Sequence, residues 1–209
     1  MREKSYSGKN NIIKLDNSFY QRDDVVKIAR ELIGKCIFTN FNNNLTAGII
    51  TETEAYKGII DKASHSYGNK RTKRTEIMYH DGGIAYIYLC YGIHSLFNIV
   101  TNKKDIPDAV LIRSIVPYYG LTTILSRLNK VKYKTNYTNG PGKVTKALGI
   151  NYKHTGIDLN KNIIWLENIR YVFNKEDIII GKRIGIDYAE EDSLLPYRFK
   201  LNIKKLHLL

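Results

Sequence analysis

The chain has 209 residues, of which 33 are lysine or arginine and 20 are aspartate or glutamate, giving a formal charge of +13. This length allows one domain with its own hydrophobic core, and two cysteines are too few for a disulfide framework. The charge favours a polyanionic partner, nucleic acid first and an anionic membrane second, although a biased genomic composition would also enrich lysine.

The start of the chain is polar, and we expect residues 1–15 to form an arm ahead of a single domain that spans residues 16–209. It lacks the apolar core of a secretory signal, and no stretch approaches the roughly eighteen apolar residues of a membrane-spanning helix. The sequence therefore predicts an intracellular protein without a membrane partner, which in a bacterium would be cytoplasmic and associated with the nucleoid.

Helical periodicity comes first along the chain. Asp23 or Asp24 can cap a helix in which apolar residues recur at spacings of three and four from Val25 to Ile33, and Gly34 marks its end. These residues predict one helix with a single buried stripe.

A β-hairpin is predicted next. Residues 36–39 and 45–56 are apolar and β-branched runs on either side of an asparagine-rich turn. Because side chains of a strand alternate between its faces, Glu52, Glu54 and Tyr56 should share one face. A carboxylate held near a water and a sugar carbon can remove a proton as that water attacks, but a solvated strand face is the commoner place for a glutamate.

The polar segment at residues 57–76 is predicted to be a loop, and loops of this length are usually functional or disordered. His65 lies in it, where a lone histidine is often simply exposed. No metal site is expected, because no second histidine or cysteine stands at metal-ligand spacing. The basic run that follows is equally compatible with a solvated loop and with phosphate contacts. It consists of Lys70, Arg71, Thr72, Lys73 and Arg74.

Two aromatic and β-branched runs, residues 84–91 and 94–101, predict a second β-hairpin, interrupted at Gly92. Tyr86 is expected to pack in the core. Tyr91, in contrast, lies near the hairpin tip, where a large ring contributes little to folding. A protruding ring can enter a base stack and hold open the gap left by an extruded nucleotide.

The second half of the chain is predicted to supply further strands and short helices. An apolar strand at residues 109–116 carries one charge, Arg113, and an arginine in such a run seldom lies buried without a partner. The turn at residues 139–143 resembles a phosphate-cradling turn at a helix start, but it lacks P-loop spacing and is expected to be mainly structural. The other predicted elements are a helix at residues 121–128 and closing strands at residues 183–186 and 198–201.

Taken in order, these residues resemble the alkyladenine (3-methyladenine) DNA glycosylase family. The resemblance covers most of the chain, from the first helix to residue 199, and many matched points in order are far more specific than any one motif. The segments that carry it are residues 52–56 (Glu-Thr-Glu-Ala-Tyr), 65–67, 71–74, 86–94, 98–100, 111–113 and 140–143.

The resemblance implies hydrolysis of the N-glycosidic bond of alkylated or deaminated purines, such as 3-methyladenine, in double-stranded DNA, which leaves an abasic site. Glu54 would be the general base for the attacking water, and Arg113 would help to hold that water and a nearby phosphate. The backbone carbonyl of Ile184 would be the third group on the water. The enzyme would be a monofunctional glycosylase of base excision repair, acting as a monomer without a metal or an organic cofactor.

The resemblance also implies how DNA is held. Tyr56 and His65 would line one side of the flipped base and Tyr88 the other, and Asn98 at the pocket floor would disfavour the exocyclic amino group of guanine. Tyr91 would be the intercalating wedge. The residues implied as contacts to phosphates and the DNA backbone are Arg71, Thr72, Lys73, Arg74, Gly92 and Lys143.

The fold implied by the resemblance is one mixed α/β (α+β) domain with a curved antiparallel sheet, a protruding β-hairpin and flanking helices. The elements predicted from the residues fit it. One departure is the sequence Tyr-His-Asp-Gly-Gly at residues 79–83, where family members often have prolines. It bears on the turn that leads into the tyrosine-rich strand rather than on the chemistry.

Two other functions compete with a glycosylase. A nucleic-acid-binding protein without catalytic activity would use the same basic loop and tyrosines, but would leave Glu54 and Arg113 without a role. A sugar hydrolase would use Glu52 and Glu54 as paired carboxylates, but neighbours on one strand face would not straddle a bond. Persistent DNA binding in a Glu54→Gln variant that no longer releases bases would separate the first case.

Overall fold

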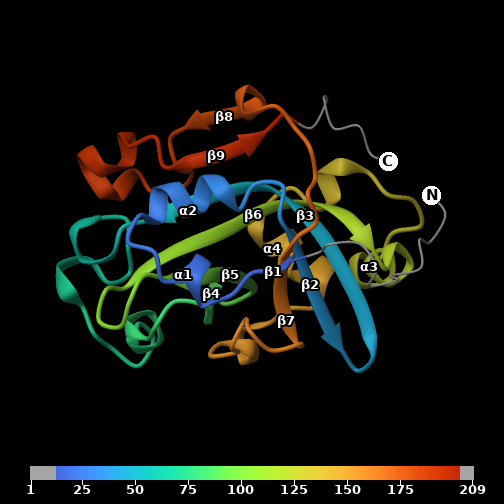
Figure 1. Cartoon of the computed structure of the whole chain (residues 1–209), viewed down its shortest axis with the longest axis horizontal. Helices are drawn as coiled ribbons and strands as arrows, with labels where there is room; N and C mark the ends of the chain where they lie inside the picture. Colours follow the sequence, from blue (N-terminus) through green and yellow to red (C-terminus); the bar gives the residue numbers. More distant parts are fainter. Residues whose placement is uncertain (1–12, 203–209) are drawn as a thin grey trace.

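The computed structural model describes residues 13–202, whose strands form one open antiparallel sheet with helices packed on its faces (Figure 1). This is the mixed α/β fold that the sequence predicted. The strands are β1 (Ile13–Lys14), β2 (Cys36–Phe41), β3 (Asn44–Tyr56), β4 (Ala85–Cys90), β5 (His94–Thr101), β6 (Asp108–Tyr119), β7 (Ile164–Asn168), β8 (Ile178–Gly181) and β9 (Arg198–Leu201). The helices are α1 (Asn17–Tyr20), α2 (Val25–Glu31), α3 (Leu121–Leu128) and α4 (Pro141–Leu148).

The strand order is β1-β7-β2-β3-β6-β5-β4, and β9 adds to the far half of β3 with β8 beside it. Of the expected polar arm, residues 1–12 lie outside the described residues, whereas Ile13 and Lys14 pair with β7. Within residues 13–202 none of the helices has both the length and the apolar character needed to cross a bilayer.

The first hairpin forms as predicted, with β2 continuing to Phe41. Asn42 and Asn43 make the turn between Phe41 and Asn44, with φ angles of 53° and 60°. Two left-handed residues match the twist of a hairpin, and asparagine tolerates this conformation better than most residues do. The asparagine-rich sequence therefore fixes both the position and the register of this turn.

β3 is the strand around which the sheet is arranged, because it changes partners along its length. Its near half pairs with β2 and its far half with β9, while β6 follows it on the other edge. Residues 46–55 are buried throughout. The Glu-Thr-Glu segment at residues 52–54 is paired with strands on both edges. Because its residues are also buried, the expectation of a solvated face is wrong for it.

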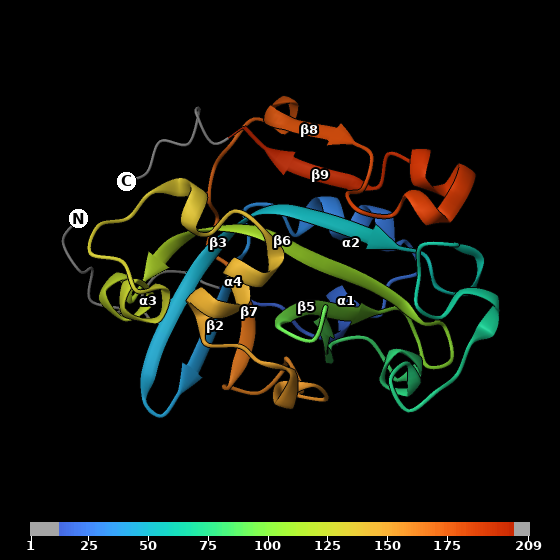
Figure 2. The ribbon, with the colours of Figure 1, turned by 180° about the vertical axis from the view of Figure 1, so that it is seen from behind.

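Helices α2 and α4 lie on opposite faces of this part of the sheet, as the two opposed views show (Figures 1 and 2). The predicted cap is present, with Asp24 accepting from the Lys27 N–H at 2.9 Å. Thr53 of β3 donates to the Ala29 carbonyl of α2 at 2.7 Å. Since neighbouring strand residues face opposite ways, Glu54 faces away from α2. The core between α2 and the sheet includes Val25, Ile28, Ala29, Leu32, Ile50, Ile112 and Phe199.

Two irregular segments gather at one end of the sheet, at the right in Figure 2. Residues 57–79 hold short 3-10 turns, as expected for a loop, and residues 187–194 form another such turn. The backbone N–H of Lys62 donates to Asp192 at 2.8 Å and joins the two segments. The expected strand at residues 183–186 is wrong: the chain leaves the sheet after β8, and Gly185 has a φ of +75°.

The turn that leads into β4 depends on its two glycines. A side chain on Gly82 would lie 2.6 Å from the Tyr20 carbonyl oxygen, and Gly83 has a φ of +101°. Only glycine fits both requirements without moving the backbone. The departure at residues 79–83 is therefore accommodated by packing this turn against α1.

Candidate active site

Glu54 lies deep in the sheet, and its side chain has 0% of its surface exposed. Tyr56 donates from its hydroxyl to Oε2 at 3.0 Å, and the backbone N–H of Ile184 donates to Oε1 at 2.8 Å. Both carboxylate oxygens are bound from different segments of the chain. The carboxylate is therefore held in one orientation.

Arg113 reaches Glu54 because of an irregularity in the pairing of β3 with β6. Glu52 faces Ser114 and the next residue of β3 faces Ile112, so Arg113 is left between them without a partner in the ladder. An extra residue of this kind is a β-bulge, which re-aims its side chain. The guanidinium lies between two carboxylates, with Nη1 3.1 Å from Glu54 Oε2 and Nε 3.3 Å from Glu52 Oε1.

Glu52 is bound by cations from two strands. Besides Arg113, its carboxylate contacts Arg198 at 3.2 Å and Lys200 at 3.4 Å, both from β9. These contacts offset the cost of burying a charge. Glu52 and Glu54 share Arg113 from one side of the strand, so they do not flank a bond as the two carboxyl groups of a sugar hydrolase do.

Opposing effects set the ionisation of Glu54. Burial raises the pKa of its carboxyl above the ordinary value, because the charged form is poorly solvated, and the charge of Glu52 adds to this. Arg113, the Ile184 N–H and the Tyr56 hydroxyl lower the same pKa. A carboxylate whose pKa is raised accepts a proton more readily than a free one.

A cavity of about 450 Å³ opens beside these groups and extends to the tip of the second hairpin. Its size is typical of sites for small ligands or single bases. All four residues expected to form the base pocket line it, together with four others from the expected site. The pocket residues are Tyr56, His65, Tyr88 and Asn98, and the others are Arg74, Tyr91, Arg113 and Ile184.

The aromatic wall of the cavity is built around His65. The His65 and Tyr88 rings are in edge-to-face contact, with centroids 4.6 Å apart, and His65 Nδ1 lies 2.7 Å from the Tyr86 hydroxyl. His65 is therefore held against the tyrosines of β4. Burial, followed by the charges of Arg74 and a nearby lysine, lowers the pKa of His65 to about 4, so the imidazole is neutral at physiological pH.

Asn98 is buried on β5, opposite Tyr86 of β4. Its amide nitrogen donates to the carbonyl oxygens of Tyr86 and Leu96 at 3.2 and 3.3 Å. The strand backbone thus fixes the position of this side chain at the cavity wall. Tyr86 itself is buried, as predicted.

The second hairpin forms as predicted, with Tyr91 at its tip. β4 and β5 pair up to Cys90 opposite His94, which leaves a three-residue turn. Tyr91 and Gly92 adopt left-handed φ angles of 52° and 72°. A left-handed φ is unfavourable for tyrosine. The Tyr91 ring gains no packing in return, because 91% of the residue's surface is exposed. Folding makes no use of this ring.

The cations expected to contact phosphate have different surroundings. Arg71 pairs with two carboxylates at 2.9 and 3.1 Å. The Arg74 guanidinium lies 4.7 Å from the Tyr88 ring centroid and 3.1 Å from His65 Nε2, at the cavity wall. Lys143, in the first turn of α4, donates to a neighbouring carbonyl at 3.0 Å. Of all the residues expected to contact phosphates and the DNA backbone, those outside the cavity lining are Arg71, Thr72, Lys73, Gly92 and Lys143.

Two charged residues of the site were not expected from the sequence. Arg183 and Asp61 form a buried ion pair, and the guanidinium lies 4.9 Å from the Tyr56 ring centroid. They are 122 positions apart, so no local spacing relates them. The sequence signal that could have pointed to Arg183 was its position directly before the apolar sequence Ile-Gly-Ile.

Among residues 13–202, no three His, Cys, Asp or Glu side chains gather to form a potential metal site. Cys36 is buried, whereas Cys90 is only partly buried because it ends β4 near the hairpin tip. The acidic residues next to the cavity, Glu52, Glu54 and Asp61, are instead bound by arginine and lysine.

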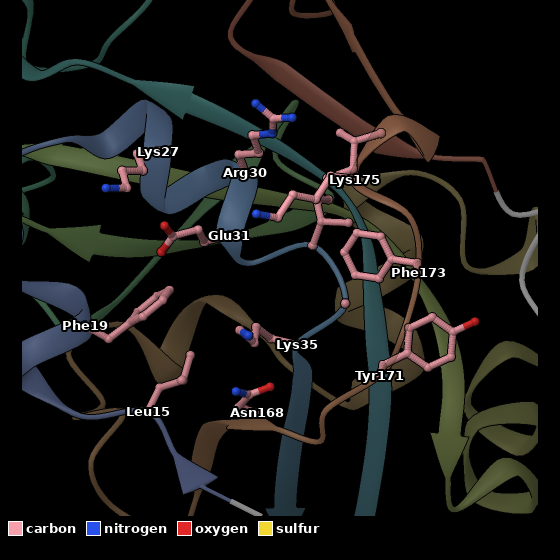
Figure 3. A pocket seen from close by; sticks show the side chains of 13 residues that line it. Leu15, Phe19, Lys27, Arg30, Glu31, Lys35, Asn168, Tyr171, Phe173 and Lys175 are labelled. Atoms are coloured by element: carbon pink, nitrogen blue, oxygen red, sulfur yellow. The ribbon is translucent and has the colours of Figure 1, made fainter.

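A second hollow of about 570 Å³ lies on the α2 side of the sheet (Figure 3). Lys27, Arg30 and Glu31 reach it from α2, Lys35 from the start of β2, and Lys175 from the segment before β8. None of these four cations has an ion pair with another described residue. The hollow offers positive charge and aromatic surface, but no buried carboxylate.

Comparison of the sequence with known proteins finds a matching family and similar proteins. Residues 18–205 match the family model described as Methylpurine-DNA glycosylase. The chain is 47% identical over 191 residues to a Chlamydia abortus protein, covering 91% of the chain and 99% of that protein. It is 44% identical over 202 residues to a Clostridium novyi protein, covering 92% and 96%. Both relatives carry the name "Putative 3-methyladenine DNA glycosylase".

Proposed function

The chain belongs to the methylpurine-DNA glycosylase family, and we propose that it flips damaged purines out of duplex DNA and hydrolyses their N-glycosidic bond with a water activated by Glu54. Family membership makes it a DNA glycosylase, a hydrolase of DNA repair that acts on methylpurines such as 3-methyladenine. One observation carries the finer proposal: a single cavity runs from the groups that bind the buried Glu54 to the exposed ring of Tyr91.

In the proposed reaction, water attacks C1′ of the deoxyribose and gives a proton to Glu54. The C1′–N bond breaks, the base leaves with the electron pair, and an abasic site remains. Arg113 holds the carboxylate and the water. The Ile184 turn supplies its backbone carbonyl to the water, which is consistent with its N–H already bonded to Glu54 at 2.8 Å. A base made cationic by alkylation leaves readily, so aligning the water is the main task of the enzyme.

We expect Tyr56 and His65 to line one side of the flipped base and Tyr88 the other. The neutral imidazole supports this arrangement, because it adds stacking surface without repelling a cationic purine. Asn98, whose amide is held at the cavity wall, would form the floor of the base pocket and oppose the exocyclic amino group of guanine. Selectivity would thus combine stacking with exclusion of one normal base.

Tyr91 is proposed to fill the gap left by the flipped nucleotide. Extrusion costs a few kcal/mol and least for a damaged or mispaired base, so selection begins before the pocket is reached. Gly142 of α4 lies against His94, so the start of α4, with Lys143, flanks the hairpin that carries Gly92. These residues, with Arg71, Thr72, Lys73 and Arg74, are proposed to contact the DNA backbone; Arg71 and Arg74 would exchange their internal partners for phosphate.

Incubation with lesion-bearing duplexes followed by alkaline cleavage tests the proposal. Separate duplexes carry 3-methyladenine, 7-methylguanine, hypoxanthine or ethenoadenine. Strand breaks should appear only after alkali, because the proposed reaction has no lyase step. The chain is also proposed to act as a monomer without a metal or an organic cofactor. Intact strands for every lesion would contradict the proposal, and breaks before alkali would contradict its monofunctional character.

A further inference from the structure

The Arg183 side chain is fully buried although it is charged. Nη1 donates to the carbonyl oxygen of Ala55 at 2.9 Å, and Nη2 to that of Asp192 at 3.1 Å. Both nitrogens also bind the Asp61 carboxylate. The guanidinium covers the Tyr56 ring at 4.9 Å from its centroid. Arg183 therefore joins the end of β3 to two irregular segments.

Asp61 organises the loop that follows β3. Its Oδ2 accepts from the Lys57 N–H and its Oδ1 from the Ala63 N–H, both at 3.0 Å. The carboxylate thus closes residues 57–63 on themselves and fastens them to Arg183. Two residues beyond Ala63, the same segment supplies His65 to the cavity.

The residue after Arg183 touches Glu54. Ile184 donates its N–H to one carboxylate oxygen, and Tyr56, whose ring Arg183 covers, donates its hydroxyl to the other. Residues 182–186 belong to no strand, so sheet pairing does not fix the Ile184 amide. Two of the groups that hold Glu54 therefore depend on where Arg183 lies.

We propose that Arg183 and Asp61 form a positioning clamp that holds the Ile184 amide and the Tyr56 hydroxyl on Glu54. The inference rests on the proposed role of Glu54 as general base. Neither clamp residue lines the cavity, so both act through their neighbours. The clamp replaces the strand pairing that the 182–186 segment lacks.

Releasing the clamp should change the ionisation of Glu54 in a known direction. The Ile184 N–H and the Tyr56 hydroxyl both lower the pKa of Glu54, so their loss raises it. A general base must be deprotonated, so the acid limb of the rate profile moves to higher pH. The charged and titratable groups around Glu54 are Glu52, Tyr56, Arg113 and the charge of Arg183 itself, with Arg198 and Lys200 acting through Glu52.

Two variants of the full chain test the clamp, Asp61→Asn and Arg183→Lys. The lysine keeps the positive charge but loses the planar fork that binds a carboxylate through two bonds. Single-turnover base release is measured against pH on a lesion-bearing duplex, with thermal unfolding in parallel. We expect the acid limb to move up by roughly one pH unit in both variants. Arg22→Lys, which perturbs the Arg22–Glu31 pair beside α2, is the matched control and should leave the acid limb in place.

An unchanged acid limb with reduced thermal stability would make the pair purely structural and would overturn the clamp. If Asp61→Asn does not fold, Arg183→Lys decides by the same criterion. Failure of the underlying function is distinguishable: the unsubstituted protein would then release no base, or Glu54→Gln would be fully active. A shifted acid limb in both variants, with Arg22→Lys unshifted, supports the clamp.

Discussion

The two hollows lie on opposite sides of the sheet and differ in how their charges are held. Beside Glu54 the charges are buried, and each carboxylate binds cations or backbone groups from other segments. Beside α2 the cations project around an open hollow without ion pairs to other described residues, and Lys35 is only half-buried (Figure 3). The α2 hollow is the larger of the two, at about 570 against 450 Å³.

Size and positive charge therefore do not distinguish the proposed active site from the hollow beside α2. Taking a charge out of water is costly, so a buried, fully bound cluster persists only when several segments converge on it. Exposed lysines cost little and respond weakly to their surroundings. Burial with specific partners is what orients a carboxylate and shifts its pKa. Of these two hollows, only the one beside Glu54 has a buried carboxylate with such partners.

The largest loss of activity is expected at Glu54, beside the cavity with the buried charges. We expect Glu54→Gln to lower the single-turnover rate by about 10²- to 10⁴-fold, the usual contribution of a general base, because the amide keeps the shape but cannot take the proton. Binding to a lesion-bearing duplex should persist. Gel-shift and base-release assays on the same protein check this, and a variant that releases bases at the normal rate would remove Glu54 from the mechanism.

A smaller effect is expected at Arg113, which both carboxylates share. Arg113→Gln removes a cation that lowers the pKa of Glu54, so that pKa rises and more of the base is protonated at a given pH. We expect a loss of about 10- to 100-fold on the acid side, recovering as the pH rises. Arg198→Gln is the matched control, since it takes a cation from Glu52 but does not contact Glu54. Equal acid limbs in the two variants would contradict this account.

Tyr91 tests the mouth of the same cavity. Tyr91→Ala should lower the rate on duplex DNA by roughly tenfold, in line with the worth of one base–aromatic contact, and leave thermal stability unchanged because the ring is exposed. Tyr91→Phe should keep most of the activity. Tyr152→Ala, at an exposed tyrosine outside the cavity lining, is the control. Equal losses in both alanine variants would point to a general surface effect.

The smallest effect is expected in the other hollow. Lys35→Ala removes a half-buried cation on the α2 side of the sheet, away from Glu54, and should change base release by less than about twofold. Base-release rates of the variant and of the unsubstituted protein, measured at the same salt concentrations, check this. A loss comparable to that of Tyr91→Ala would show that both hollows contribute to base release.

Much of the fold followed from local patterns in the sequence. Helical spacing from Val25 onward predicted α2, and the asparagine turn at Asn42 predicted the first hairpin. The tyrosine-rich runs predicted the second hairpin and put Tyr91 at its tip. These features succeed because they depend on the period of a helix or strand and on turn chemistry, which neighbours along the chain determine.

The sequence by itself determined that Glu54 and Tyr56 share one strand face, because alternation along the strand requires it, and the resemblance supplied the roles proposed for them. Tertiary structure decided how they are held. The bulge that aims Arg113, the pairing of Arg183 with Asp61, and the irregular segment in place of a strand at residues 183–186 all arise from contacts between distant segments. Local periodicity is blind to such contacts, because a buried charge settles wherever the assembled fold brings it a partner.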